Sequence, residues 1–234
     1  MKSIRTALLL SLATSAILAT ASFQGHTLKF SGKAGDVSTY RLTGEFEAQG
    51  MTVGLSALLK SKIVSVDANG DYTVEEEQSS MVITFGGQEM PMPPSPPTRS
   101  KMKANGEVIS ITGDDSGEDS YRAAALTSFY YPSKAINVGD SWTFEGKGDD
   151  KLGIKPFTAT YKFEAVETVG KYETAKISYT VKETGGSIPA TAKGLIWLDT
   201  KASDMIKLES AWENFPTPGA PEPITGKIKV EKVD

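Results

Sequence analysis

Histidine and cysteine, the side chains that most often act as nucleophiles, general bases and transition-metal ligands, are almost missing from this chain. Its 234 residues contain one histidine, His26, and no cysteine. A Ser-His-Asp triad would have to use His26, and a Cys-His pair cannot be built. Zinc, iron and copper(II) sites draw on the same two residue types. We therefore expect no enzyme and no transition-metal site, with His26 in a solvated N-terminal tail.

Carboxylates and thioethers are the remaining candidates for chemistry. Residues 114–119 hold four carboxylates without the spacing of an EF-hand loop, and acidic residues before a helix also favour its N-terminal dipole. Met90 and Met92 could offer thioethers to copper(I), but packing within the protein is the simpler interpretation. Glu75-Glu76-Glu77 is interpreted as a solvated strand edge. No metal and no cofactor is predicted, while a hydrolase acting through carboxylates alone stays open, because only their separation in space decides it.

The N-terminus has the three parts of a secretory signal peptide. Lys2 and Arg5 form the positive region, residues 7–18 are apolar, and Ala19-Thr20-Ala21 gives the small-x-small pattern that is cut before Ser22. The apolar stretch is short for a membrane span, which needs about 20 residues. We expect residues 1–21 to be removed, leaving an exported chain, periplasmic or extracellular, with no membrane span.

Cleavage would remove two positive charges and move the formal net charge from −4 to −6. A mildly acidic chain lacks the basic face that nucleic-acid binding requires, so no nucleic-acid partner is expected. Without cysteine there is no disulfide, and stability must come from an ordinary apolar core.

Alternation of apolar and polar residues dominates the rest of the sequence. This period of two predicts antiparallel strands with one buried and one solvated face, about ten or eleven in all. Asn69-Gly70 and Asn105-Gly106 predict type I′ hairpins between strands. The apolar positions of the clearest runs are Tyr40, Leu42 and Phe46; Met51, Val53, Leu55, Ala57, Leu59 and Ile63; Phe157, Ala159, Tyr161 and Phe163; and Ala175, Ile177, Tyr179 and Val181.

Residues 117–132 depart from this pattern and predict a helix between two similar halves, 22–116 and 133–234. Asp119-Ser120 would cap the helix, Pro132 would end it, and Phe129 and Tyr130 would extend its apolar side. Residues 61–72 align with residues 161–172 at an offset of 100, and Gly35-Asp36 matches Gly139-Asp140 at an offset of 104. We expect one duplicated, mainly antiparallel all-β domain, a curved sheet or an open barrel with a single short helix.

Residues 132–144, Pro-Ser-Lys-Ala-Ile-Asn-Val-Gly-Asp-Ser-Trp-Thr-Phe, resemble a motif of uncharacterised exported bacterial proteins. In that family, a domain of unknown function, Val-Gly-Asp-Ser-Trp opens the second half of a duplicated β domain. Residues 105–108 and 194–200 are also similar to its recurring pieces. The resemblance covers most of the mature chain and implies a fold but no activity. A curved sheet behind a signal peptide is also distantly similar to envelope lipoprotein carriers of the LolA and LppX kind.

These observations favour a secreted, non-enzymatic protein that binds an apolar ligand, such as a lipid, in the hollow of a curved sheet. The residues expected to line that hollow are Tyr40, Leu55, Phe163 and Tyr179. The alternative is a structural or protein-interaction module that contacts another envelope protein through exposed proline-rich loops. The residues expected in those loops are Pro91, Met92, Pro94, Pro218 and Pro221.

Overall fold

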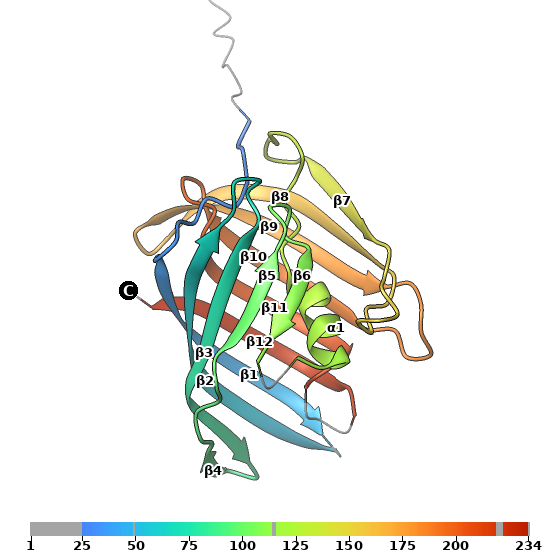
Figure 1. The fold of residues 1–234 in the computed structure, drawn as a ribbon. Coiled ribbons are helices and arrows are strands. Elements are labelled where there is room, and N and C mark those ends of the chain that lie inside the picture. The colour runs from blue at the N-terminus through green and yellow to red at the C-terminus, as the bar shows by residue number, and fades with distance from the viewer. Residues whose placement is uncertain (1–24, 49, 114–115, 219–221, 234) are drawn as a thin grey trace, which may run out of the picture.

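A computed structural model describes residues 25–48, 50–113, 116–218 and 222–233, which form one open antiparallel sheet of 12 strands and one helix (Figure 1). The predicted all-β fold is confirmed, with one strand more than the upper expectation. The predicted signal peptide lies outside the described residues. The strands are β1 (Val37–Ala48), β2 (Met51–Val66), β3 (Tyr72–Phe85), β4 (Gln88–Pro91), β5 (Thr98–Met102), β6 (Val108–Thr112), β7 (Ser141–Gly146), β8 (Phe157–Val169), β9 (Tyr172–Glu183), β10 (Thr191–Asp199), β11 (Met205–Phe215) and β12 (Ile224–Val233).

The strand order places the first and last strands next to each other in the middle of the sheet. It runs β6-β5-β3-β2-β1-β12-β11-β10-β9-β8-β7, and β4 pairs with β3. The chain thus starts in the middle at β1, runs outward to β6, crosses through helix α1 (Glu118–Thr127) to the far edge at β7, and returns to β12 beside β1. Residues 113–140 connect the two edges. Figure 1 shows β5 and β6 curling in front of the strands of the second half.

The two faces of the sheet differ in chemistry. The inner face carries the apolar positions predicted from the alternation, and α1 packs on it. Many charges of the outer face lie opposite an opposite charge on the next strand, as Glu45 does opposite Lys227 and Arg41 opposite Glu231. Such cross-strand pairs add stability at a solvated surface. The inner face is therefore the place to look for a site for an apolar ligand.

The helix is shorter than the sequence predicts. Its N-cap is Gly117 and its C-cap is Ser128, whose backbone is extended, so Phe129 and Tyr130 leave the helix. Side chains from the sheet capture this segment: the Tyr161 hydroxyl donates to the Ser128 carbonyl and accepts from the Tyr130 N–H (both 3.2 Å). The Trp142 indole donates to the Tyr130 carbonyl at 2.8 Å. The prediction of a helix to Pro132 was wrong because these tertiary hydrogen bonds replace the helical ones.

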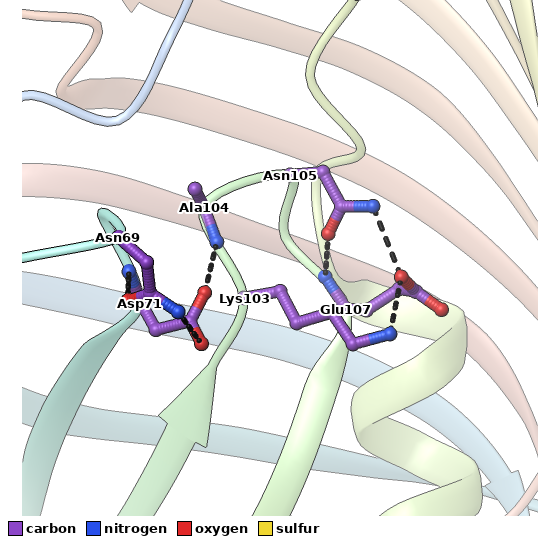
Figure 2. A network of polar contacts seen from close by, with 6 residues as sticks. All are labelled: Asn69, Asp71, Lys103, Ala104, Asn105 and Glu107. Carbon is purple, nitrogen blue, oxygen red and sulfur yellow. Dashed lines mark hydrogen bonds and ion pairs between the residues drawn. The ribbon is translucent and has the colours of Figure 1, made fainter. Parts of the chain in front are cut away.

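Two hairpin tips lie side by side and have the same construction (Figure 2). In each, the glycine after the asparagine adopts a positive φ, 88° at Gly70 and 95° at Gly106, while both asparagines keep a negative φ. The tips are therefore type I turns followed by a left-handed glycine, and the predicted type I′ turns were wrong. The asparagine side chains favour this turn type, since Asn69 Oδ1 accepts a hydrogen bond from the Asp71 N–H and Asn105 Oδ1 accepts one from the Glu107 N–H. The Ala104 N–H joins the tips by donating to Asp71 Oδ1 at 3.2 Å.

The turns that precede β1 and β7 match in detail. Gly35 N–H donates to the Ile63 carbonyl and Ile63 N–H to the Asp36 carbonyl; Gly139, Phe163 and Asp140 repeat both bonds. In each turn the aspartate carboxylate also accepts from the backbone N–H three residues earlier, at 2.7 Å and 2.8 Å. The sequence offsets of 104 and 100 thus correspond to the same local structure.

His26 is held against the sheet. Its backbone pairs with Ile136 through two hydrogen bonds, and its half-buried ring packs edge-on against Phe163, with 5.2 Å between ring centroids. The prediction of a solvated tail residue was wrong, because this short bridge anchors the N-terminal segment.

Candidate ligand-binding site

One face of the sheet has two environments. In the second half, the inner side chains of β8 and β9 are almost fully buried; Ala159, Phe163, Ala175 and Ile177 each have 0% exposure. In the first half, the inner side chains Tyr40, Leu42, Leu55, Leu59 and Ile83 are only half-buried. Phe85 and Met90, further along the same face, are 39% and 45% exposed. The first half therefore presents an apolar surface that this protein leaves partly open.

Two segments cover the second half of the inner face: His26 packs on Phe163, and α1 is the other. The helix packs against β6, β9 and β10 and is fixed there by Arg122, whose guanidinium donates to both oxygens of Glu183 on β9 at 2.6 Å and 2.7 Å. Arg122 also donates to the Ile188 carbonyl, and the Ala190 N–H donates to Glu183. The bidentate pair holds the helix over the second half of the sheet, away from β1 and β2.

A cavity of about 290 Å³ lies between α1 and the open half. Its walls combine small helix residues with strand and loop residues, and the volume is near the lower limit of small-ligand pockets, about 300 Å³. The residues that define it are Leu59 of β2, Glu76, Glu77 and Gln78 of β3, Thr98 and Ser100 of β5, Ile111 of β6, Ser120, Ala123, Ala124 and Thr127 of α1, and Ser95, Pro96 and Pro218 of the two proline-rich loops.

Glu76 is the charged group that faces inward at this cavity. Its neighbours Glu75 and Glu77 lie on the outer face opposite Lys62 and Lys60, so strand alternation turns Glu76 inward, between Ser61 of β2 and Thr98 of β5. Glu75 and Glu76 lie between β2 and β5, so the interpretation as a strand edge was wrong for these two; Glu77 lies beyond the last pair with β5. Within the described part of the chain, the Glu76 carboxylate accepts no hydrogen bond and forms no ion pair.

The surroundings of Glu76 disfavour its charge. The protein atoms around the cavity bury its carboxyl enough to raise the pKa above the ordinary value, although the side chain is exposed to solvent. Burial, with a smaller contribution from Glu76, also raises the pKa of Tyr72 to about 12, and burial raises that of Tyr40 to about 12.

Two hydroxyl groups near this cavity have no hydrogen-bond partner. They are Ser120 Oγ, in the cavity wall, and Thr217 Oγ1, beside the cavity residue Pro218; both atoms are buried. Unpaired buried hydroxyls are uncommon in native proteins. Because Ser120 and Glu76 line the same cavity, this is the candidate polar end of a binding site.

The ligand-binding residues predicted from sequence are not brought together. Tyr40 and Leu55 lie on the open half of the inner face, and Tyr179 donates to Ser210 Oγ at 2.7 Å further round the sheet. Phe163 is completely buried in the core. Of the four, Tyr40 lines a described cavity, one of about 210 Å³ next to the Asp204–Lys232 ion pair.

The proline-rich loops lie at the surface and meet at the Glu76 cavity. Every residue from Phe85 to Pro97 is exposed, including Pro91, Met92 and Pro94, and so is Pro218. Pro221 lies outside the described residues. Ser95 and Pro96 from the first loop and Pro218 from the second line the same cavity, although more than a hundred residues separate them.

A wider groove of about 540 Å³ lies on the outer face and is lined by residues of β1, β10, β11 and β12, Lys193, Glu209 and Lys227 among them. It is shallow, and charges of both signs surround a mainly apolar floor.

No group of three or more potential metal-ligating side chains occurs among the described residues, and none of their helices is long and apolar enough to cross a membrane. Two of the carboxylates considered for calcium, Asp114 and Asp115, lie outside them.

No family model matches the sequence, and no curated protein matches it significantly. Lipovitellin, from a study of its lipid–protein interactions, is similar with a TM-score of 0.45 and 12% identity over 86% of this chain, which spans only 25% of the lipovitellin chain. A Bacteroides fragilis protein described as exported, with a YmcC-like fold, has a TM-score of 0.36 and 12% identity over 89% of this chain and 100% of its own. DynF, of the dynemicin biosynthesis pathway of Micromonospora chersina, has a TM-score of 0.22 and 5% identity, covering 97% and 92%. At these sequence identities and TM-scores, none of the three proteins indicates an activity or a ligand for this chain.

Sequence reasoning missed Glu76 as a member of the site, although a signal was present. Residues 74–78, Val-Glu-Glu-Glu-Gln, interrupt an otherwise regular alternation, so a strand through them must place a polar side chain inward. The ion pair between Arg122 and Glu183 had no such signal in the sequence, because the two residues are 61 positions apart.

Proposed function

We propose that this chain is an exported, non-enzymatic protein that binds a long-chain, lipid-like ligand on the open half of its inner face. The observation that carries the proposal is the contrast across one continuous face. Most inner side chains of β8 and β9 are covered, whereas many of those of β1 to β4 are half-buried or exposed, with Phe46, Ala57 and Tyr72 as the buried ones. An uncovered apolar face inside a curled sheet has the character of a ligand site rather than of an ordinary surface.

Two further features support the proposal. The predicted signal peptide favours export.

The arrangement of carboxylates at the Glu76 cavity is the second feature. Glu77 also lines this cavity, but it is the next residue of the same strand and lies opposite Lys60 on the outer face. Glu76 therefore has no second carboxylate facing it among the described cavity residues, and glycoside hydrolysis by two carboxylates needs such a partner across the bond.

Two neighbouring substitutions on β2 test the proposal. Leu55 faces inward and Ser56 faces outward on the same strand. Leu55→Glu places a charge on the apolar face, so we expect binding of the uncharged fluorophore N-phenyl-1-naphthylamine to weaken at least about tenfold. Ser56→Glu adds the same charge to the outer face and should leave binding unchanged. Circular dichroism of both exported proteins checks that they are folded.

Absence of fluorophore binding by the unsubstituted protein, or equal binding by the two folded variants, would contradict the proposal. Native mass spectrometry of protein purified from its own host provides an independent measurement, in which we expect a stoichiometric adduct of lipid mass.

A second candidate is a protein-interaction module built on the first proline-rich loop. The exposure of its whole length, with Met90 and Met92 at 45% and 43%, favours this role. A photo-crosslinking residue at Pro94 would then capture one defined envelope protein in the native host. The same residue at Lys60, on the outer face of β2, is the control and should capture none.

A further inference from the structure

The inner face carries one carboxylate that nothing in the described protein neutralises. Glu76 has no hydrogen-bond or ion-pair partner there. The inner-face cation on β12, Lys232, is already paired with Asp204 at 2.6 Å. The cavity side chains from β5, β6 and α1 are uncharged: Thr98 and Ser100, Ile111, and Ser120, Ala123, Ala124 and Thr127.

We propose that the cavity beside Glu76 binds the positively charged amine head group of a long-chain amphiphile, whose chain lies on the open apolar face. This inference rests on the proposed function and specifies the chemical class of its ligand.

Charge complementarity favours an amine over other head groups. Glu76 has no cationic partner in the described protein, so a cation that enters the cavity gains a charge-assisted hydrogen bond with its carboxylate. A neutral ligand would cover Glu76 and leave it unpaired, which is unfavourable. An anionic ligand would be repelled.

The remaining polar groups of the cavity are hydroxyls and an amide. Ser120 Oγ is unpaired, and Thr98, Ser100 and Gln78 also line the space. These groups can accept hydrogen bonds from the additional N–H groups of an ammonium ion. A primary ammonium, which has three donors, suits this wall better than a fully alkylated one.

The apolar chain has a continuous surface to follow from the cavity. Leu59 lines the cavity, and Ala57 and Leu55 occupy the next inward positions of β2. Four residues of extended strand separate Leu59 from Leu55, which corresponds to about 13 Å. Beyond Leu55 lie the inward Ile83 and the exposed Met90, which pair with each other on β3 and β4.

The test compares head groups on one chain. Dodecylamine, dodecanol and dodecanoate compete with N-phenyl-1-naphthylamine for the full exported protein, below their micelle concentrations and near neutral pH. We expect dodecylamine to displace the fluorophore at about tenfold lower concentration than dodecanol, with dodecanoate the weakest. Glu76→Gln should bring dodecylamine to the level of dodecanol, and Glu76→Lys should favour dodecanoate. Glu45→Gln, which removes an outer-face carboxylate of β1, should preserve the original order.

The outcomes separate this inference from the proposed function. Fluorophore binding with no preference for the amine, or a preference that Glu76→Gln leaves intact, would overturn the inference and leave apolar binding standing. No fluorophore binding at all would overturn both. Glu76→Gln preserves the shape of the side chain, and its thermal unfolding confirms that the comparison is made between folded proteins.

Discussion

We expect Glu76, although exposed, to lower the stability of the folded protein at neutral pH. Burial raises the pKa of its carboxyl, so the folded state holds the proton more tightly than the unfolded state. The stability that this proton contributes is present at acid pH and is lost as the pH rises through the folded-state pKa. A residue that is unfavourable for stability and faces a cavity is typical of a functional position.

A pH series on Glu76→Gln measures this cost. We expect the variant to melt at the same temperature as the unsubstituted protein near about pH 4 and at a higher temperature near about pH 7, because glutamine carries no charge to bury. The neighbouring Tyr40 and Tyr72, each with a pKa of about 12, do not titrate in this window. A difference in melting temperature that is constant with pH would contradict the assignment, and Glu45→Gln serves as the exposed control.

Single residues were the least predictable level of this structure. The alternation correctly placed Leu55 and Phe163 on the apolar face, but it could not say that Phe163 is fully buried against His26 while Leu55 stays half-buried. That distinction depends on which segments cover the face. The bridge of His26 with Ile136 joins residues 110 positions apart, so no local pattern encodes it.

At the scale of elements, the Arg122–Glu183 pair determines the position of α1. Glu183 is 2% exposed, so removing the arginine leaves a buried carboxylate without its counter-charge. Removing one partner of a buried ion pair destabilises a protein far more than replacing both partners with apolar residues.

Urea unfolding of Arg122→Met should show a loss of about 3 kcal/mol. The double variant Arg122→Met, Glu183→Leu should recover part of that loss, because it removes the unpaired charge together with its partner. A double variant less stable than the single one would show that the Ala190 N–H bond to Glu183, and not the arginine, carries the effect.

The segment after the helix offers a second test. Tyr161→Phe leaves the Ser128 carbonyl and the Tyr130 N–H without their partner, and we expect a loss of about 1–3 kcal/mol in the free energy of unfolding. Tyr179→Phe removes a hydroxyl bonded to one side chain, that of Ser210, and should cost less. Equal losses would mean that the hydroxyl of Tyr161 does not hold the segment.

The helix illustrates what local pattern can and cannot predict. Its start was predicted within two residues, but the expected cap, Asp119-Ser120, was wrong: both residues lie inside the first turn, and the N-cap is Gly117. Its end was predicted five residues late, since Phe129 and Tyr130 continue the helical spacing in sequence while hydrogen bonds from Tyr161 and Trp142 hold them elsewhere.

At the scale of the whole molecule, the first and last strands meet in the middle of the sheet. β1 and β12 pair over nine positions, from Thr39 with Val233 to Glu47 with Thr225. The antiparallel sheet and the hairpin order followed from the sequence, because alternation and turn residues are local. The β1–β12 pairing did not, since it joins residues almost two hundred positions apart. The matching turns before β1 and β7 agree with an internal duplication, which stays a prediction.

A disulfide between β1 and β12 tests this closure. Thr43 lies opposite Lys229 on the outer face, and the chain has no native cysteine to interfere. Thr43→Cys with Lys229→Cys should form the bond under mild oxidation and raise the free energy of unfolding by a few kcal/mol, because it closes a very long loop. Failure to form a disulfide in the folded protein would contradict the pairing of these strands.

The meeting of β1 with β12 also sets an order of events for a growing chain. Residues 37–48 leave the ribosome long before residues 224–233, so β1 has β2 on one side and bare backbone donors and acceptors on the other until synthesis is nearly complete. An uncovered edge of this length is a template for pairing with a second chain. Its native partner is also the one most distant in sequence, which makes this contact slow to form. Holding the nascent first half apart from its copies is therefore a requirement that this topology places on the cell.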